Sequence, residues 1–359
     1  MRFWHSAWMV ELRSFVSPKV HLFIISMSLM FVLSVLPVVS AGSQNLSSYG
    51  RPSLSSSQLT KSYAALGDSY SSGEGNGSYY LGSNTSIDKC HRSPVAYGPE
   101  LASKYKVGSF SFVACSGAVT ADLFAPNHKY PTEAAQLDSL SASTTAVTLT
   151  IGGDDVGFAQ LLADCVWGIG YGGPGCSHNP AATSMVNYDL TALANLSPIC
   201  PTSDLPISKA SNTPITSWLC VLLAVHKAAP SAVIDLVGYP GLFANFSDSS
   251  CQVGSLDGFY PLFIAQSDAK WLNLVAQEGV SDEGAAVIAA QKLGVPATFT
   301  NVNPMFSTHR FCDSARLYFH PISITSTFFQ SVVFPGSMHP NAYGVSAYVS
   351  AIERSMTKA

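Results

Sequence analysis

Short apolar stretches, rich in β-branched and aromatic residues, recur along the chain and alternate with helical stretches. A long helix is predicted over residues 262–293, and another over residues 342–356, after Pro340. Strands and helices alternating in this order predict an α/β fold, a three-layer α/β/α sandwich with a central, mostly parallel sheet. The predicted strands of that sheet are residues 63–66, 109–114, 146–151, 232–237 and 297–302.

One longer apolar run, residues 20–41, precedes the first predicted strand. Arg13 and Lys19 lie before it, and the small residues Val39 and Ala41 stand at the −3 and −1 positions of a signal-peptidase site. We therefore expect residues 1–41 to be a secretory signal peptide and the mature protein to be extracellular. The alternative is an uncleaved membrane anchor, because about 18 to 20 apolar residues can span a bilayer.

The rest of the chain divides into a linker and a domain. Residues 42–60 are rich in serine and show no apolar period, which is typical of a flexible linker. Residues 61–359 can bury one sizeable core and predict a single domain. Within it, residues 160–220 are rich in glycine, proline and cysteine and predict an irregular insertion of the kind that forms lids or binding rims.

Composition narrows the function further. The chain is 47% hydrophobic and 11% charged, with a formal net charge of −4. These values exclude intrinsic disorder and a basic nucleic-acid binder, so no nucleic-acid partner is expected.

The eight cysteines include no C-x-x-C pair, and their even number favours disulfides over zinc binding or thiol redox chemistry. This agrees with export. Eight cysteines allow 105 pairings. Their order along the chain suggests Cys90 with Cys115, Cys165 with Cys176, Cys200 with Cys220, and Cys251 with Cys312.

The first predicted strand leads into Gly67-Asp68-Ser69, where a helix should begin. Active sites of parallel sheets form beyond the carboxyl ends of the strands, and a helix N-terminus favours negative charge. Ser69 is therefore a candidate nucleophile. The alternative is a turn in which Ser69 only caps the helix.

Three further segments bear on a site near Ser69. The second and third strands end in the glycine-rich segments 115–118 and 151–158, where backbone N–H groups can approach a ligand closely. His339 lies in a predicted loop beside the start of the closing helix, with turn residues around it. Glu74, in the loop after Ser69, is expected to be a solvated charge. His309 and His320 show no paired ligand spacing, so no metal site is expected.

The segments that contain Ser69, residues 115–118, residues 151–158 and His339 resemble, in this order, the four sequence blocks of the SGNH (GDSL-type) hydrolases. The resemblance is to the secreted actinobacterial esterases and lipases in particular. The resemblance extends from Tyr63 to the C-terminus and includes the stretches 89–93, 238–240 and 309–313. It also supports three of the cysteine pairs, those of Cys90, Cys165 and Cys251, and leaves Cys200 with Cys220 as an additional bridge.

The resemblance implies a serine hydrolase of carboxylic esters that uses no metal or cofactor. Ser69 would be the nucleophile and His339 the general base and later the general acid. The N–H groups of Ser69 and Gly117 would be two donors of the oxyanion hole. A catalytic acid usually stands three residues before the histidine, but that position here is Gly336. Because a backbone carbonyl replaces the acid in some members of the branch, we expect the carbonyl of Gly336 to orient His339.

Besides the missing acid at position 336, the sequence departs from the family in the third block. This block is Gly-Gly-Asn-Asp in the family, whereas residues 152–155 of this chain are Gly-Gly-Asp-Asp. The asparagine supplies the third oxyanion donor, whereas an ionised Asp154 only accepts hydrogen bonds. One donor contributes ~2.7 to 4 kcal/mol, and a carboxylate about 3 Å from the oxyanion would repel it by ~5 kcal/mol. A protonated Asp154, its pKa raised by burial beside Asp155, would donate instead and confine activity to acidic pH. Alternatively, Asp154 turns to solvent and two donors suffice at a lower rate.

The sequence therefore predicts a secreted, monomeric esterase or lipase that acts on a small-molecule or lipid ester, with contact to a lipid or cell-wall surface. Two alternatives stay open. One is a polysaccharide (acetyl) esterase, and the other is a weakly active or inactive SGNH fold that binds a glycan or lipid. The apolar residues of the insertion, such as Leu161 and Leu162, either line an acyl pocket or pack the insertion onto the sheet.

Overall fold

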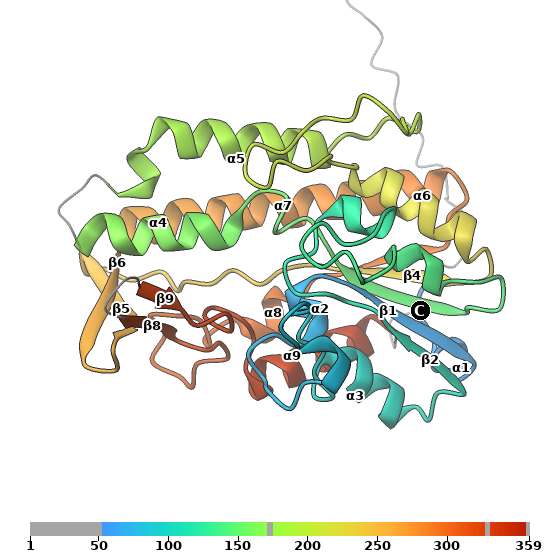
Figure 1. Cartoon of the computed structure of the whole chain (residues 1–359), viewed down its shortest axis with the longest axis horizontal. Coiled ribbons are helices and arrows are strands. Elements are labelled where there is room, and N and C mark those ends of the chain that lie inside the picture. The colour runs from blue at the N-terminus through green and yellow to red at the C-terminus, as the bar shows by residue number, and fades with distance from the viewer. Residues whose placement is uncertain (1–51, 171–174, 327–330, 357–359) are drawn as a thin grey trace, which may run out of the picture. The chain divides into compact units, whose positions relative to one another are not determined.

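The central sheet consists of five parallel strands in the order β2-β1-β3-β4-β7 (Figure 1). The computed structural model describes residues 52–170, 175–326 and 331–356. All five predicted strands are confirmed, and β3 and β4 are buried along their whole length, as expected for a parallel sheet covered on both faces. The strands are β1 (Ser62–Gly67), β2 (Ser109–Phe112), β3 (Ala146–Thr150), β4 (Val233–Val237) and β7 (Ala297–Thr300).

Helices cover both faces of this sheet, which confirms the predicted three layers (Figure 1). One layer contains α6 (Trp218–Ala228) and α7 (Gln266–Lys292), and the opposite layer contains α3 (Tyr97–Lys104) and α9 (Ala342–Met356). Both long predicted helices, α7 and α9, are present. The other helices are α1 (Ser56–Leu59), α2 (Ser69–Ser72), α4 (Phe158–Gly170), α5 (Pro180–Leu193) and α8 (Asn303–Phe306).

A second sheet, in the order β6-β5-β8-β9, has no counterpart in the sequence prediction. Residues 262–265, predicted as the start of the long helix, belong to strand β6, because they pair with β5 in an antiparallel hairpin. An apolar run as short as Leu262-Phe263-Ile264 fits a strand as well as a helix, and its pairing partner decides between them. The strands are β5 (Ser250–Leu256), β6 (Tyr260–Ala265), β8 (Ile322–Ser326) and β9 (Ser331–Val333).

The predicted linker is wrong over residues 52–60, which pack against the domain. Leu54 and Leu59 are fully buried, and Ser55 and Gln58 form a capping box at the start of α1. Two buried leucines therefore anchor a segment whose serine content alone suggests flexibility. The predicted signal peptide, residues 1–41, lies outside the described residues. Among the helices of the described segments, none has the length and hydropathy to cross a bilayer.

The insertion at residues 160–220 contains most of α4 and all of α5, so it is not irregular as predicted. Asn179 caps α5 by accepting hydrogen bonds from the N–H groups of Ala181 and Ala182, and Pro180 follows at the first helical position. Two disulfides fix this insertion. The cysteines pair as their order suggests: Cys90–Cys115, Cys165–Cys176, Cys200–Cys220 and Cys251–Cys312.

Candidate active site

The turn from β1 into α2 presents Ser69 at the carboxyl edge of the central sheet. Gly67 has φ +120°, and a Cβ there would lie 2.3 Å from the carbonyl oxygen of Thr150, so this position requires glycine. Asp68 caps α2 by accepting a hydrogen bond from the N–H of Tyr70 at 3.0 Å. Ser69 is the first residue of the helix, and only 8% of it is exposed.

A tight loop holds His339 at the same edge. The N–H of Ser337 donates to the carbonyl of Phe334 at 2.9 Å, and the N–H of His339 donates to the carbonyl of Gly336 at 3.1 Å. His320 brackets the loop, since its N–H donates to the carbonyl of His339 and its carbonyl accepts from the N–H of Met338. The backbone on both sides of His339 is therefore fixed.

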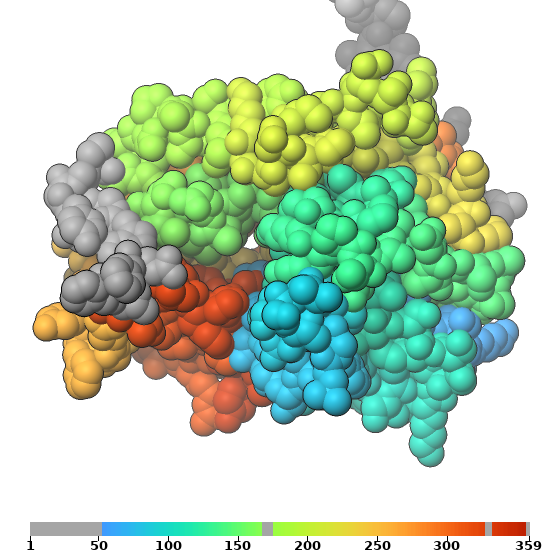
Figure 2. Space-filling model, in the orientation of Figure 1, coloured from blue at the N-terminus to red at the C-terminus, as the bar shows by residue number. Residues whose placement is uncertain are grey.

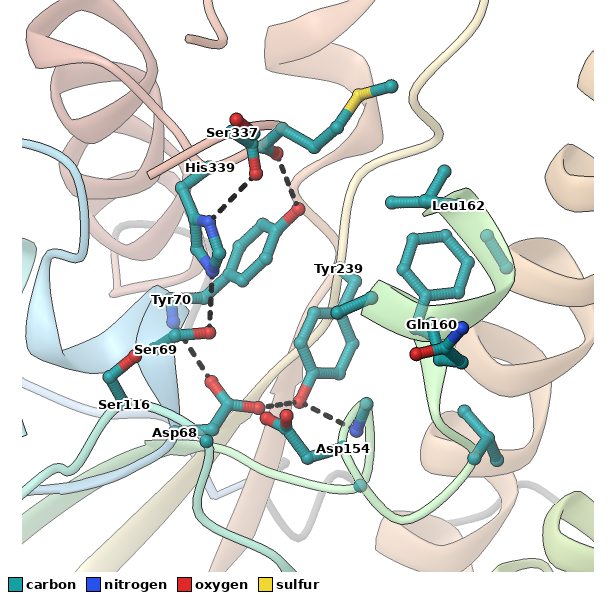
Figure 3. A pocket seen from close by; sticks show the side chains of 18 of the residues that line it. Asp68, Ser69, Tyr70, Ser116, Asp154, Gln160, Leu162, Tyr239, Ser337 and His339 are labelled. Carbon is teal, nitrogen blue, oxygen red and sulfur yellow. Dashed lines mark hydrogen bonds between the residues drawn. The ribbon is translucent and has the colours of Figure 1, made fainter. Parts of the chain in front are cut away.

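Ser69 and His339 are in direct contact (Figure 3). His339 Nε2 lies 2.7 Å from Ser69 Oγ, and Nδ1 lies 3.1 Å from the carbonyl oxygen of Ser337. Because a carbonyl only accepts hydrogen bonds, this contact places the ring proton on Nδ1 and leaves Nε2 free to accept the proton of Ser69. The carbonyl of Gly336, the partner expected from the sequence, accepts the backbone N–H of His339 and also raises the pKa of the imidazole, but the 3.1 Å contact with Nδ1 is made by the carbonyl of Ser337.

Tyr70 joins the nucleophile helix to the histidine loop. Its hydroxyl donates to the carbonyl of Met338 at 3.0 Å, and the centre of its ring lies 5.2 Å from that of His339. Burial holds the pKa of His339 below its ordinary 6.5, although the carboxylate of Glu74 acts in the opposite direction. The imidazole is therefore neutral at neutral pH and available as a base.

A cavity of about 470 Å³ opens beside Ser69. Figure 2 shows the surface hollowed between α4, the segment around residue 125 and the orange-red C-terminal segment. Gly117 and Asp154 line the cavity with Ser69, so the expected oxyanion-hole residues come together. Within the described part of the chain, no hydrogen bond uses the amide N–H of Ser69 or Gly117. Both amides are available to a ligand.

Asp154 and Asp68 lie close together below the nucleophile, with the hydroxyl of Tyr239 beside them (Figure 3). The Tyr239 hydroxyl donates to Asp68 Oδ2 and accepts the N–H of Gly153 at 3.2 Å. Burial and the charge of Asp154 raise the pKa of Asp68 to about 7. Burial also raises the pKa of Asp154, while the Lys129 and His128 charges oppose that shift. Asp155 contributes little to it, because its carboxylate turns away to Thr120.

Glu74 is not the solvated charge expected from the sequence. Only 2% of the residue is exposed. Its carboxylate accepts hydrogen bonds from Tyr79 Oη at 2.9 Å and from the N–H of Gly75 at 3.0 Å, and it lies 2.6 Å from His91 Nδ1. Burial disfavours its charge, but hydrogen bonds from His91 and Ser116 lower the pKa of Glu74 below its ordinary value. The neighbouring glycines in the sequence suggest an open loop and gave no signal of this burial.

Two other site residues carry weak sequence signals. Tyr239 belongs to the stretch Gly238-Tyr239-Pro240 that follows β4, and this place at a strand end could have marked it. Lys129 lines the cavity from an irregular segment for which the sequence offers no periodicity.

No family model matches the chain. A lipase of Streptomyces rimosus is 29% identical over 286 residues, which are 79% of this chain and 82% of that protein. Lipase 1 of Streptomyces coelicolor is 29% identical over 284 residues, with the same coverage.

Two solved structures share the fold. Phospholipase A1 of Streptomyces albidoflavus is 28% identical with a TM-score of 0.58, covering 83% of this chain and 99% of that one. The extracellular lipase of Streptomyces rimosus is 26% identical with a TM-score of 0.57, covering 82% and 99%. The likeness therefore spans nearly all of both solved proteins. In sequence and in fold the chain is therefore similar to Streptomyces lipases and a phospholipase A1, which is consistent with the SGNH (GDSL-type) hydrolases and with hydrolysis of carboxylic esters.

Proposed function

We propose that this protein is a serine esterase of lipid carboxylic esters, with Ser69 as nucleophile and His339 as general base. The observation that carries the proposal is the 2.7 Å contact between Ser69 Oγ and His339 Nε2, in a tautomer that can accept the serine proton. A nucleophile and a base within hydrogen-bonding distance, with the base oriented by a third group, are what acyl transfer requires.

In the proposed reaction, His339 takes the proton of Ser69 as Oγ attacks the ester carbonyl carbon. The carbonyl electron pair moves to the oxygen, which the N–H groups of Ser69 and Gly117 stabilise. His339 then protonates the departing alcohol, leaving an acyl-enzyme. Water, deprotonated by the same imidazole, releases the acid and restores Ser69.

The walls of the cavity support a substrate with an acyl chain. Helix α4 contributes Phe158, Leu162 and Val166, while Leu161 is buried without lining the cavity. The insertion therefore both packs onto the core and offers an apolar wall. The names of the similar proteins, lipase and phospholipase A1, support lipid esters as the substrate class.

We propose that Asp154 acts as the third oxyanion donor only when it is protonated. The base requires a pH above the pKa of His339, which burial holds below 6.5. The donor requires a pH at which Asp154 keeps its proton, and burial raises that limit above the ordinary 3.8. Activity would therefore rise from acidic pH to a maximum and fall again as Asp154 ionises.

The test is the pH dependence, from pH 4 to 9, of p-nitrophenyl butyrate hydrolysis by the parent, Ser69→Ala and Asp154→Asn. We expect Ser69→Ala to lose activity at every pH. Asp154→Asn should extend activity to neutral pH and raise it there above that of the parent, since an amide donates at every pH. An organophosphonate should label Ser69 in the parent.

Activity that persists in Ser69→Ala would contradict the assignment of the nucleophile. If the parent shows no activity at any pH while Asp154→Asn is active, the natural protein is an inactive hydrolase that binds its ligand without cleaving it. An unchanged pH profile in Asp154→Asn would show that Asp154 takes no part in the oxyanion hole.

A further inference from the structure

Lys129 is the only lysine or arginine, among the described residues, that lines the cavity beside Ser69. Its Nζ lies 3.3 Å from the carbonyl oxygen of Gly117, and a Cβ built on Gly117 would lie 2.6 Å from the same Nζ. The ammonium thus covers Gly117, whose N–H is a proposed oxyanion donor. Asp154 lines the same cavity.

The backbone that carries Lys129 is held in place by buried groups. Asp122, which is 2% exposed, accepts hydrogen bonds from Asn127 Nδ2 at 3.2 Å and from the N–H of His128 at 2.8 Å. Asn127 Oδ1 in turn accepts the N–H groups of Lys129 and Tyr130, both at 2.9 Å. The position of the lysine is therefore built into the loop, and only its side chain is free to move.

Asp154 stands where the family has an asparagine, and a cation can supply the stabilisation of the oxyanion that is then missing. An ionised Asp154 supplies no donor and repels the negative oxygen of the tetrahedral intermediate. Among the charges that act on Asp154, Lys129 is the largest that favours its ionised form. A lysine side chain is long and flexible enough to move its ammonium within the cavity while its backbone stays fixed.

We propose that the Lys129 ammonium replaces the missing amide of the oxyanion hole: it neutralises ionised Asp154 and stabilises the negative oxygen that forms when Ser69 attacks the ester. This inference rests on the proposed function. The proton balance of the reaction is unchanged, because Lys129 keeps its proton throughout. Lys129 therefore acts as an electrostatic group, and its contribution depends on the charge at residue 154.

A double-mutant cycle tests this dependence. The values of kcat/KM for p-nitrophenyl butyrate are measured at pH 8 for the parent, Lys129→Met, Asp154→Asn and the double variant. We expect Lys129→Met to lower kcat/KM about tenfold to 100-fold in the parent, less than a fully enclosed donor because the ammonium is exposed. In the Asp154→Asn background the same change should cost less than about twofold, since the amide then donates.

Two controls separate this role from a structural one. Lys104→Met removes an exposed lysine that pairs with Glu353 outside the cavity and should leave kcat/KM unchanged. Lys129→Arg should retain most of the activity, and the melting temperature of Lys129→Met should match that of the parent.

An equal loss from Lys129→Met in both backgrounds would overturn the proposal, as would no loss in either. A parent without activity at pH 8, beside an active Asp154→Asn, would also overturn it, because Lys129 would then fail to compensate for the carboxylate. Failure of the proposed function itself is distinct, since it would appear as activity that survives Ser69→Ala in any of these backgrounds.

Discussion

The buried carboxylate of Glu74 complements the uncharged partner of His339. The carbonyl of Ser337 orients the imidazole at 3.1 Å but carries no charge to offset the imidazolium that forms during catalysis. Glu74 precedes Gly75, which packs closely against the histidine loop. A Cβ built on Gly336 in that loop would lie 2.5 Å from the Cα of Gly75. Of the charges that act on His339, Glu74 is the largest that raises its pKa. In the proposed mechanism, this charge in the neighbouring loop takes over the electrostatic part of the missing catalytic acid.

Replacing Glu74 by Gln should therefore weaken the base. Because the carboxylate raises the pKa of His339, its loss should move the acidic limb of the kcat/KM profile to lower pH and reduce the maximum about threefold to tenfold. The pH profile measures both effects. Glu133→Gln is the matched control, since Glu133 pairs with Arg92 at 2.7 Å and does not act on His339. A lower maximum without a shifted limb would contradict the electrostatic role.

At this scale, the sequence indicates the proposed nucleophile and base, but not which carbonyl contacts the imidazole. The serine and the histidine follow from motifs. Which of the two carbonyls, Gly336 or Ser337, lies at hydrogen-bonding distance from the ring depends on the backbone of the turn, which no residue pattern encodes.

Two helices from distant parts of the chain form the apolar walls of the cavity. Residues at four-residue spacing, Phe158, Leu162 and Val166, point into it from α4. Helix α7 contributes Val275, Ala276, Gly279 and Val280 from its own inward face. The width between α4 and α7 should therefore limit the acyl chain that the enzyme accepts.

Narrowing this space should change the preferred chain length. Ala276→Phe adds an aromatic ring to the wall and should lower kcat/KM for p-nitrophenyl palmitate about tenfold, with less than about twofold effect on the butyrate. Leu274→Phe, on the exposed side of α7, is the control. Equal losses for both esters would show that the long chain does not lie between α4 and α7.

The elements differ in how far the sequence predicts them. The inner strands β3 and β4 are buried along their whole length and have a strong apolar pattern, whereas the edge strands β2 and β7 are only partly buried. The second sheet is formed by short strands, and β8 pairs with β5 across more than sixty residues of chain. Pairing at such sequence distance leaves no local signal for β8. Residues 262–265 of β6 form an apolar run too short to distinguish a strand from a helix.

Across the whole molecule, disulfides close loops of very different length. Cys251 and Cys312 are separated by 61 residues and attach β5 to the segment before β8, whereas Cys165 and Cys176 are separated by 11 within the insertion. Structural disulfides persist in oxidising compartments, which supports the proposed export of the protein.

Longer loops should contribute more to stability. Replacing Cys251 and Cys312 together by Ala should lower the free energy of unfolding by about 4 kcal/mol, and replacing Cys165 and Cys176 by about 3 kcal/mol. Guanidinium denaturation under non-reducing conditions measures both. The opposite order would indicate that the insertion, rather than the second sheet, limits the stability of the native state.

The proposed nucleophile and base are separated by 270 residues of sequence, although Ser69 Oγ and His339 Nε2 are 2.7 Å apart. During synthesis the ribosome delivers the serine early and the histidine only after β8 and β9 have been made. A nascent or truncated polypeptide that lacks the histidine loop would thus hold the proposed nucleophile without its base, and would also lack the carbonyl that Tyr70 binds. On the proposed mechanism we expect such a chain to be inert toward esters, so that the producing cell meets no active hydrolase before translation has passed the histidine.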